Sequence, residues 1–140
     1  MAQSNAEVSS DQWYQSLITF YYAISRCIAK GIVSLDPLVD IAVDRLGHLV
    51  NPDGSIGKNA IETALAACAL LNFGAAPDTV DRAGTALIAS QSPVGSWPIA
   101  PIYFGGNKDE MEWGSEELTT ALALEVLIRR RGRVRTSPPA

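Results

Sequence analysis

The sequence predicts an all-α protein of about five helices, which alternate between buried and amphipathic character. Apolar residues recur at helical spacing in five segments, and residues that cap or end helices flank these segments. Apolar residues make up 47% of the 140 residues while aromatic ones make up only 7%, as in alanine-rich helical proteins. This length suffices for one domain with a real core. We expect a disordered leader at 1–10, the domain at 11–131 and a disordered basic, proline-containing tail at 132–140.

The first helix is expected from Asp11, a capping residue, to about Lys30, with Gly31 ending it. Its few polar residues form a narrow stripe at helical spacing, and the rest of its surface is apolar. We therefore expect this helix to be buried over most of its circumference.

The second helix is expected to begin with Asp36 as the cap and Pro37 in the first turn. A solvent-exposed face is predicted where polar residues recur every four positions, at Asp36, Asp40, Asp44 and His48. The opposite, apolar face carries Leu38, Ile41, Ala42, Leu46 and Leu49. Residues 51–57, which read Asn-Pro-Asp-Gly-Ser-Ile-Gly, form a turn after this helix.

The third helix begins after the capping residue Asn59 and ends at Gly74. Residues 64–71 are apolar without interruption, so protein must surround this helix on all sides.

Pro77 and Asp78 open the fourth helix, whose polar positions we expect to be exposed. A connection of 17 residues, 98–114, then leads to Ser115, which caps the fifth helix. The body of that helix, residues 118–128, is again mostly apolar. Long connections within compact domains are often functional.

An internal repeat underlies this alternation. Residues 42–56 align with 83–97 at an offset of 41, and residues 63–66 align with 120–123 at an offset of 57. Each unit therefore consists of an outer amphipathic helix, a glycine turn and an inner apolar helix.

Gln91, Gly95 and Trp97 in the second unit resemble the glutamine–tryptophan repeat of the terpenoid cyclases and the prenyltransferase β-subunits. The first unit is degenerate, and the resemblance covers roughly residues 36–130. It implies helical hairpins that form part of an α/α toroid around an apolar cavity. It also implies that the glutamine satisfies groups at a helix end while the aromatic side chain packs on the neighbouring turn.

The motifs by which that family performs its chemistry are absent. The sequence contains neither an Asp-x-Asp-Asp run nor an Asp-Asp-x-x-Asp motif, and Cys27, Cys68 and His48 do not match the family's zinc ligands. We therefore expect no metal and no cofactor. Five helices also cannot close a ring, so an apolar patch would stay exposed. We expect a homodimer or a partner subunit to complete the toroid.

The candidate site lies in the connection before the fifth helix and at the start of that helix, where aromatic and acidic residues alternate. Aromatic faces stabilise cations, and a carboxylic acid beside apolar walls can donate a proton. The acid or base candidates are Asp109, Glu110, Glu112, Glu116 and Glu117, with Glu62 a weaker one. The substrate-binding candidates are Trp97, Tyr103, Phe104 and Trp113.

Each of these residues also has a plain structural interpretation. Glu116 and Glu117 are ordinary first-turn acids of a helix, residues 109–112 can be a solvated loop, and Trp97 can be structural. The other three aromatic residues can form a lid, a pocket wall or a dimer contact.

Three hypotheses of function follow. The first is a small terpenoid-cyclase-like enzyme that binds an isoprenoid or polyene chain and promotes its cyclisation or isomerisation. The second is a non-catalytic lipid-binding or assembly subunit of a larger biosynthetic enzyme. The third, a peptide-binding helical repeat protein, explains the repeat but not the Gly-Ser-Trp turn.

The expected surroundings are cytoplasmic, because the first ten residues lack the apolar region of a secretory signal. The longest apolar stretch, residues 17–33, is interrupted by Arg26 and Lys30 and should not span a bilayer. The five arginines of residues 129–135 complement a helix C-terminus, with peripheral contact to an anionic membrane as the alternative. We expect no nucleic-acid partner.

Overall fold

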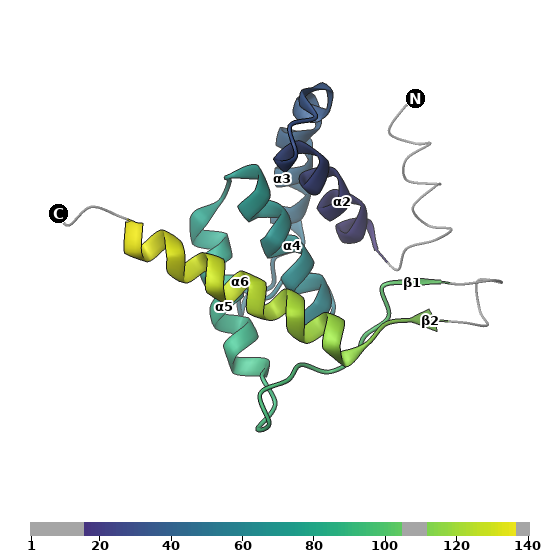
Figure 1. The fold of residues 1–140 in the computed structure, drawn as a ribbon, viewed down its shortest axis with the longest axis vertical. Coiled ribbons are helices and arrows are strands. Elements are labelled where there is room, and N and C mark those ends of the chain that lie inside the picture. Colours follow the sequence, from purple (N-terminus) through teal and green to yellow (C-terminus); the bar gives the residue numbers. More distant parts are fainter. Residues whose placement is uncertain (1–15, 105–111, 137–140) are drawn as a thin grey trace.

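The computed structural model describes residues 16–104 and 112–136, and it confirms the all-α fold (Figure 1). The helices of this part are α2 (Leu17–Ala29), the 3-10 helix η1 (Val33–Leu38), α3 (Val39–His48), α4 (Ala60–Phe73), α5 (Pro77–Ser90) and α6 (Glu116–Thr136). A short antiparallel hairpin, β1 (Tyr103–Phe104) and β2 (Glu112–Trp113), precedes α6. None of the helices in these two ranges is both long and apolar enough to cross a membrane.

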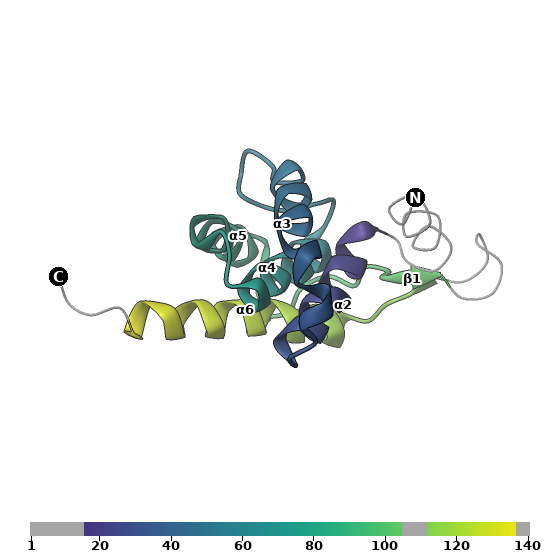
Figure 2. The same cartoon turned by 90° about the horizontal axis from the view of Figure 1, so that it is seen from above.

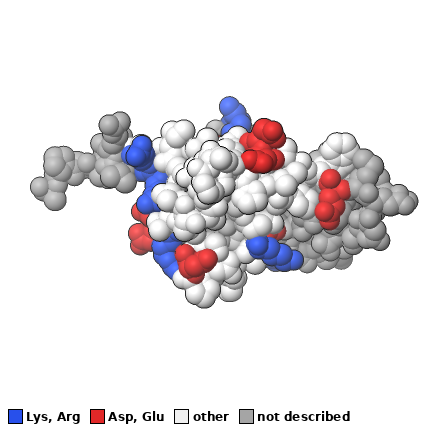
Figure 3. Space-filling view, turned by 90° about the horizontal axis from the view of Figure 1, so that it is seen from below, with Lys and Arg blue, Asp and Glu red and all other residues white. Residues whose placement is uncertain are grey.

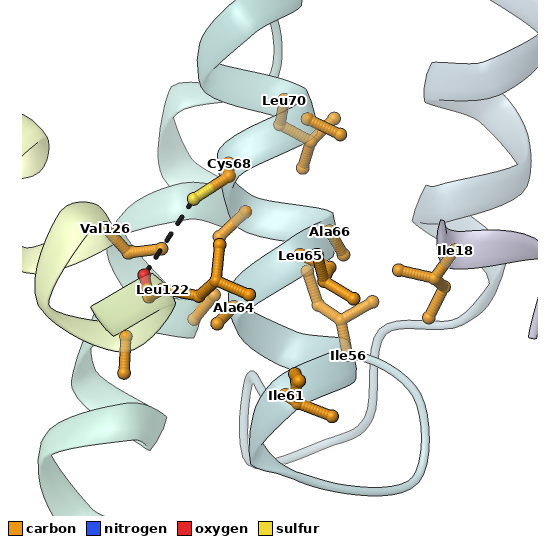
Figure 4. Packing of buried hydrophobic residues seen from close by; sticks show 14 of the residues in the cluster. Ile18, Ile56, Ile61, Ala64, Leu65, Ala66, Cys68, Leu70, Leu122 and Val126 are labelled. Atoms are coloured by element: carbon orange, nitrogen blue, oxygen red, sulfur yellow. Dashed lines mark hydrogen bonds between the residues drawn. The ribbon is translucent and has the colours of Figure 1, made fainter. Parts of the chain in front are cut away.

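Helix α4 is the centre of the fold. All ten residues of Ile61–Leu70 are buried, and the helix packs against α2, α5 and α6. Figure 4 shows α4 side chains directed both toward α2 and toward α6. Its alanines let the neighbouring helices approach closely, and they carry no polar group that needs a partner. The prediction that protein surrounds this helix on all sides is confirmed.

Both ends of α4 form as the sequence predicts. The Asn59 side chain accepts a hydrogen bond from the Glu62 backbone N–H at 3.0 Å, which satisfies one of the free donors of the first turn. Gly74 ends the helix in the left-handed conformation, with φ of 67°, which favours glycine.

Helix α2 is exposed along one narrow side. Its buried residues, Ile18, Tyr21, Ile24 and Ser25, lie on the face toward α4, while of the remaining residues only Ala23, Arg26 and Ala29 are exposed. This agrees with the expectation of burial over most of the circumference. The predicted cap Asp11 lies outside the described residues, and Gly31 follows the helix with φ of 94°.

The second predicted helix begins differently from the prediction. Residues Val33–Leu38 form η1, which contains Pro37, and Leu38 stands at the start of α3 without a side-chain cap. The fixed φ of proline suits a 3-10 turn as well as an α-turn, so Asp36 and Pro37 do not begin a new helix here. The cap predicted at Asp36 is wrong.

The two faces of this segment are only partly as predicted. The solvent-exposed face is confirmed, since Asp36, Asp40, Asp44 and His48 are all exposed. On the apolar face Ala42 and Leu46 are buried, but Leu38, Ile41 and Leu49 remain exposed.

The two glycine turns have the same structure, as the repeat predicts. In the first turn the Asn51 N–H donates to Ser55 O at 2.8 Å, and in the second the Ser92 N–H donates to Ser96 O at 2.8 Å. Gly54 and Gly95 occupy the same turn position, with φ of 89° and 92°.

The residue after each turn is tied to the inner helix that follows it. The Ile56 N–H donates to Thr63 Oγ1 at 3.1 Å, and the Trp97 N–H donates to Thr120 Oγ1 at 3.0 Å. These partners are related by the two offsets found in the sequence, 41 for Ile56 and Trp97 and 57 for the threonines. The repeat is therefore one of structure as well as of sequence.

Helix α6 begins as predicted and extends further than expected. The Ser115 hydroxyl accepts from the Leu118 N–H at 2.9 Å, which confirms the cap. The helix then continues to Thr136, past the expected end near residue 131, and its last turns extend beyond the other helices (Figure 2). Arg130 and Arg133 lie 3.5 and 3.9 Å from the Asp81 carboxylate of α5, and these ion pairs hold the later turns of α6 against α5.

Burial of α6 is confined to one face. Thr119, Leu122, Ala123 and Val126 are buried, whereas Leu118, Leu124 and Ile128 are exposed. The opposite face is left uncovered because α4 and α5 pack against only one side of the helix, and it is an exposed apolar patch of the kind expected of an unclosed ring.

Candidate functional site

The hairpin brings two of the predicted aromatic residues together through their backbones. Tyr103 lies opposite Trp113 and Phe104 opposite Glu112 in the antiparallel pairing. The Ile102 N–H extends this pairing by donating to Trp113 O at 2.8 Å. The hairpin thus joins, through the backbone, three aromatic residues and one acidic residue from separate parts of the connection.

Gly114 lets the chain pass from this hairpin into α6. A Cβ atom at this position would overlap the backbone of Ala100, so only glycine fits the close approach. The contact places the hairpin beside the N-terminus of α6, where Glu116 and Glu117 lie.

The predicted acids of the connection and of α6 that the structure describes are all on the surface. Glu112, Glu116 and Glu117 are exposed, and Asp109 and Glu110 lie outside the described residues. Glu62 is instead buried, and its carboxylate accepts a hydrogen bond from the Lys58 N–H. With the bond from the Glu62 N–H to Asn59, this makes a reciprocal cap for α4.

Trp97 lies in the core, apart from the hairpin. Its side chain has no exposed surface, and its Nε1–H donates to Leu87 O at 2.8 Å. Gln91 Nε2 donates to Gly95 O at 2.9 Å within the turn. The indole therefore satisfies a carbonyl of the last turns of α5, and the glutamine braces the turn. This reverses the roles that the family resemblance implies.

A polar cluster, which the sequence prediction missed, joins the three helices α2, α4 and α6. Asn72 Nδ2 donates to Ser25 Oγ at 3.0 Å, and Arg129 Nη1 donates to Asn72 Oδ1 at 2.9 Å. Arg129 Nη1 also donates to Glu125 Oε1 at 3.1 Å. This chain of bonds links one side chain of α2 to one of α4 and two of α6.

Two titratable groups belong to this cluster. Burial raises the pKa of the Tyr22 phenol, and the charge of Glu125 raises it further. Burial, again aided by Glu125, raises the pKa of the Cys68 thiol to about 12. Cys68 is completely buried, and its Sγ–H donates a hydrogen bond to Leu122 O at 3.9 Å. The thiol therefore stays protonated near neutral pH and is no nucleophile.

The repeat contains the signal that could have revealed this cluster. Cys68 and Asn72 of α4 correspond to Glu125 and Arg129 of α6 at the offset of 57. Both pairs are four residues apart, so each occupies one stripe of its helix. Polar pairs at equivalent positions of two otherwise apolar helices predict a contact between those helices.

Charged and polar side chains contribute to the walls of two surface clefts in the described part of the chain. The larger, of about 420 Å³, lies where the first glycine turn meets α5 and α6; its lining residues are Pro52, Asp53, Asp81, Arg82, Thr85 and Arg130. Arg82 Nη2 donates to Pro52 O at 3.1 Å across it. Each cation of this wall has a carboxylate nearby, so the cleft has no excess of one charge.

Basic and acidic side chains both occur on the face drawn in Figure 3, several of them next to one another, amid largely uncharged surface. Among the described residues, no three His, Cys, Asp or Glu side chains gather closely enough to hold a metal ion. The site that remains is the hairpin with the start of α6, beside the apolar exposed face of that helix.

Comparison of the chain with protein-family models, with curated proteins and with solved structures found no match.

Proposed function

We propose that this chain is an assembly module, a helical-hairpin repeat unit whose apolar faces pair with further helices. Together with them it encloses a hydrophobic small molecule of the isoprenoid type. The observation that carries this proposal is the exposed apolar face of α6, where Leu124 and Ile128 are 42% and 67% exposed. Apolar patches of this kind mark interaction surfaces.

The repeat supports this interpretation of the α6 face. On α4, Cys68 faces α6, since its Sγ donates to Leu122 O (Figure 4). Ile61, Ala64 and Leu71 share its stripe at helical spacing. At the offset of 57 the same stripe on α6 consists of Leu118, Ala121, Glu125 and Ile128. Three of these four residues are exposed. The face that a neighbouring helix covers in the first unit is thus uncovered in the second.

The other end of the helical array supports the same conclusion. Ile32 and Val33, before and within η1, are exposed, as are Leu38, Ile41 and Leu49. Repeat proteins need polar outer faces on their terminal units in order to stand alone. Among the described residues both ends of the array also carry exposed apolar side chains, so we assign both ends to contacts with other helices.

Catalysis of the terpenoid-cyclase type is the second candidate, and the hairpin favours it. The backbone pairing sets Phe104 opposite Glu112 and Tyr103 opposite Trp113. Trp113 is three residues before Glu116, and Asp109 of the same connection belongs to this candidate set. Exposed carboxylates need a further apolar wall before one of them can become a proton donor. Assembly would supply that wall, so both candidates depend on a partner. We place this activity in the cytoplasm.

The assembly proposal is tested by native mass spectrometry of the full chain with farnesol, using dodecanol as the control alcohol. We expect particles of more than one chain that retain farnesol in preference to dodecanol. A single chain that retains neither alcohol contradicts the proposal.

The catalytic candidate is tested by incubating the same particles with a linear polyene and analysing the products. Turnover that Asp109→Asn, Glu112→Gln and Glu116→Gln all leave unchanged contradicts the acid role of this loop.

A further inference from the structure

The exposed face of α6 carries a regular stripe. Glu117, Ala121, Leu124, Ile128 and Arg131 are all exposed, and the intervals between them are four, three, four and three residues. This spacing puts the five side chains on one face of the helix and is that of the contact seam of paired helices. The opposite face of α6 packs against α4, so the stripe points away from the core.

The charges at the two ends of the stripe have opposite signs. Glu117 lies seven residues before Leu124 and Arg131 lies seven residues after it. When two such helices pair in antiparallel order with their Leu124 residues in contact, each Glu117 lies opposite the other helix's Arg131. A parallel pair would instead set glutamate against glutamate and arginine against arginine, which is unfavourable.

We propose that the α6 stripe binds the α6 stripe of a second copy of this chain, in antiparallel order, with Leu124 on the two-fold axis. This inference rests on the proposed assembly function and names its partner. The stripe is self-complementary in charge and apolar at its centre, as a two-fold interface requires. The pairing covers Leu124 and Ile128 and adds two ion pairs at its edges.

Sedimentation equilibrium of the full chain tests whether the α6 stripe is the dimer interface. We expect the wild-type chain to form dimers and Leu124→Glu to raise the dimer Kd about 100-fold, because an unpaired charge would be buried at the axis. Val94→Glu is the matched control: Val94 is 88% exposed and lies in the second glycine turn, away from the stripe. Its dimer Kd should equal that of the wild type, and circular dichroism should show both variants to be folded.

Charge reversal tests the orientation. Glu117→Arg and Arg131→Glu should each weaken the dimer, and the chain that carries both changes should recover the wild-type Kd. Glu116→Arg, in the same helical turn but off the stripe, is the control for effects on the helix terminus.

Cross-linking gives an independent measure of the same geometry. In a chain with Cys27→Ser, Leu124→Cys should form a disulfide-linked dimer readily, whereas Glu117→Cys should not. Efficient cross-linking through Glu117→Cys instead would show a parallel pair and overturn the proposal.

The remaining outcomes separate this proposal from the assembly function. A dimer whose Kd is unaffected by Leu124→Glu overturns the α6 interface and leaves the assembly function standing. A wild-type chain that stays monomeric overturns the second copy as the partner. If such a monomer also retains no farnesol, the assembly function fails with it.

Discussion

Replacing Trp97 with alanine is expected to lower the free energy of unfolding by about 3–5 kcal/mol. The indole is fully buried between α5 and the inner helices, and its Nε1–H is the partner of Leu87 O. Removing it leaves a cavity in the core and a helix-end carbonyl without a hydrogen bond. Urea unfolding followed by circular dichroism at 222 nm measures the change.

Two further variants separate the contributions to this loss. Trp97→Phe keeps most of the buried volume but loses the hydrogen bond, and it should cost about 1–3 kcal/mol. Trp113→Ala removes the same kind of side chain from an exposed position, and its effect should stay near 0.5 kcal/mol, on the order of other surface changes. Equal losses for Trp97→Ala and Trp113→Ala would contradict the structural role given to Trp97.

Replacing Leu87 with alanine is expected to cost about 2–5 kcal/mol of unfolding free energy. Leu87 is buried where the outer helix α5 faces the core, at the position that Leu46 occupies in the first repeat unit. The variant removes three buried carbon atoms from a site that cannot collapse fully. The same urea titration measures the loss.

The adjacent residue is the matched control for this variant. Ile88 lies on the same turn of α5 but is exposed, so Ile88→Ala should change stability by only about 0.5 kcal/mol. If Ile88→Ala destabilised the chain as much as Leu87→Ala, the solvent-facing side of α5 would be wrongly assigned, and α5 would not be an outer helix.

The features predicted well from the sequence are those fixed by local chemistry. Asn59, Gly74 and Ser115 act where the chain itself supplies the hydrogen bonds or the backbone conformation that ends a helix. The repeat can also be predicted from the sequence, because Gly54 and Gly95 occupy equivalent positions in the two glycine turns. The apolar run of α4 identified the central helix, since no arrangement could expose so much apolar surface.

The features predicted wrongly depend on which neighbours are present. The apolar face predicted for the second helix suggested burial, but Leu38, Ile41 and Leu49 are exposed, because the sequence of one helix does not tell how many others pack around it. Strands β1 and β2 have two residues each, which is too short for a period of two to be seen. The later turns of α6 contact α5 through Arg130 and Asp81, and these residues are too distant in sequence for their contact to be predicted.

The candidate site was predicted in part. The sequence identified the aromatic and acidic residues of the connection, and the pairing of Tyr103 with Trp113 brings two of them together. The polar cluster around Arg129 escaped notice, because single polar residues on apolar helices look like interruptions until their partners on other helices are known. The catalytic and binding roles of the aromatic and acidic residues in the connection remain predictions.

Amide hydrogen exchange of the full chain tests most directly the central claim that α4 is enclosed by the rest of the protein. The account predicts that the amides of residues 64–70 exchange most slowly of all, only through global unfolding. Their protection should correspond to the unfolding free energy from urea titration. Exchange of these amides as fast as that of residues 39–48, on the exposed helix α3, would contradict the account.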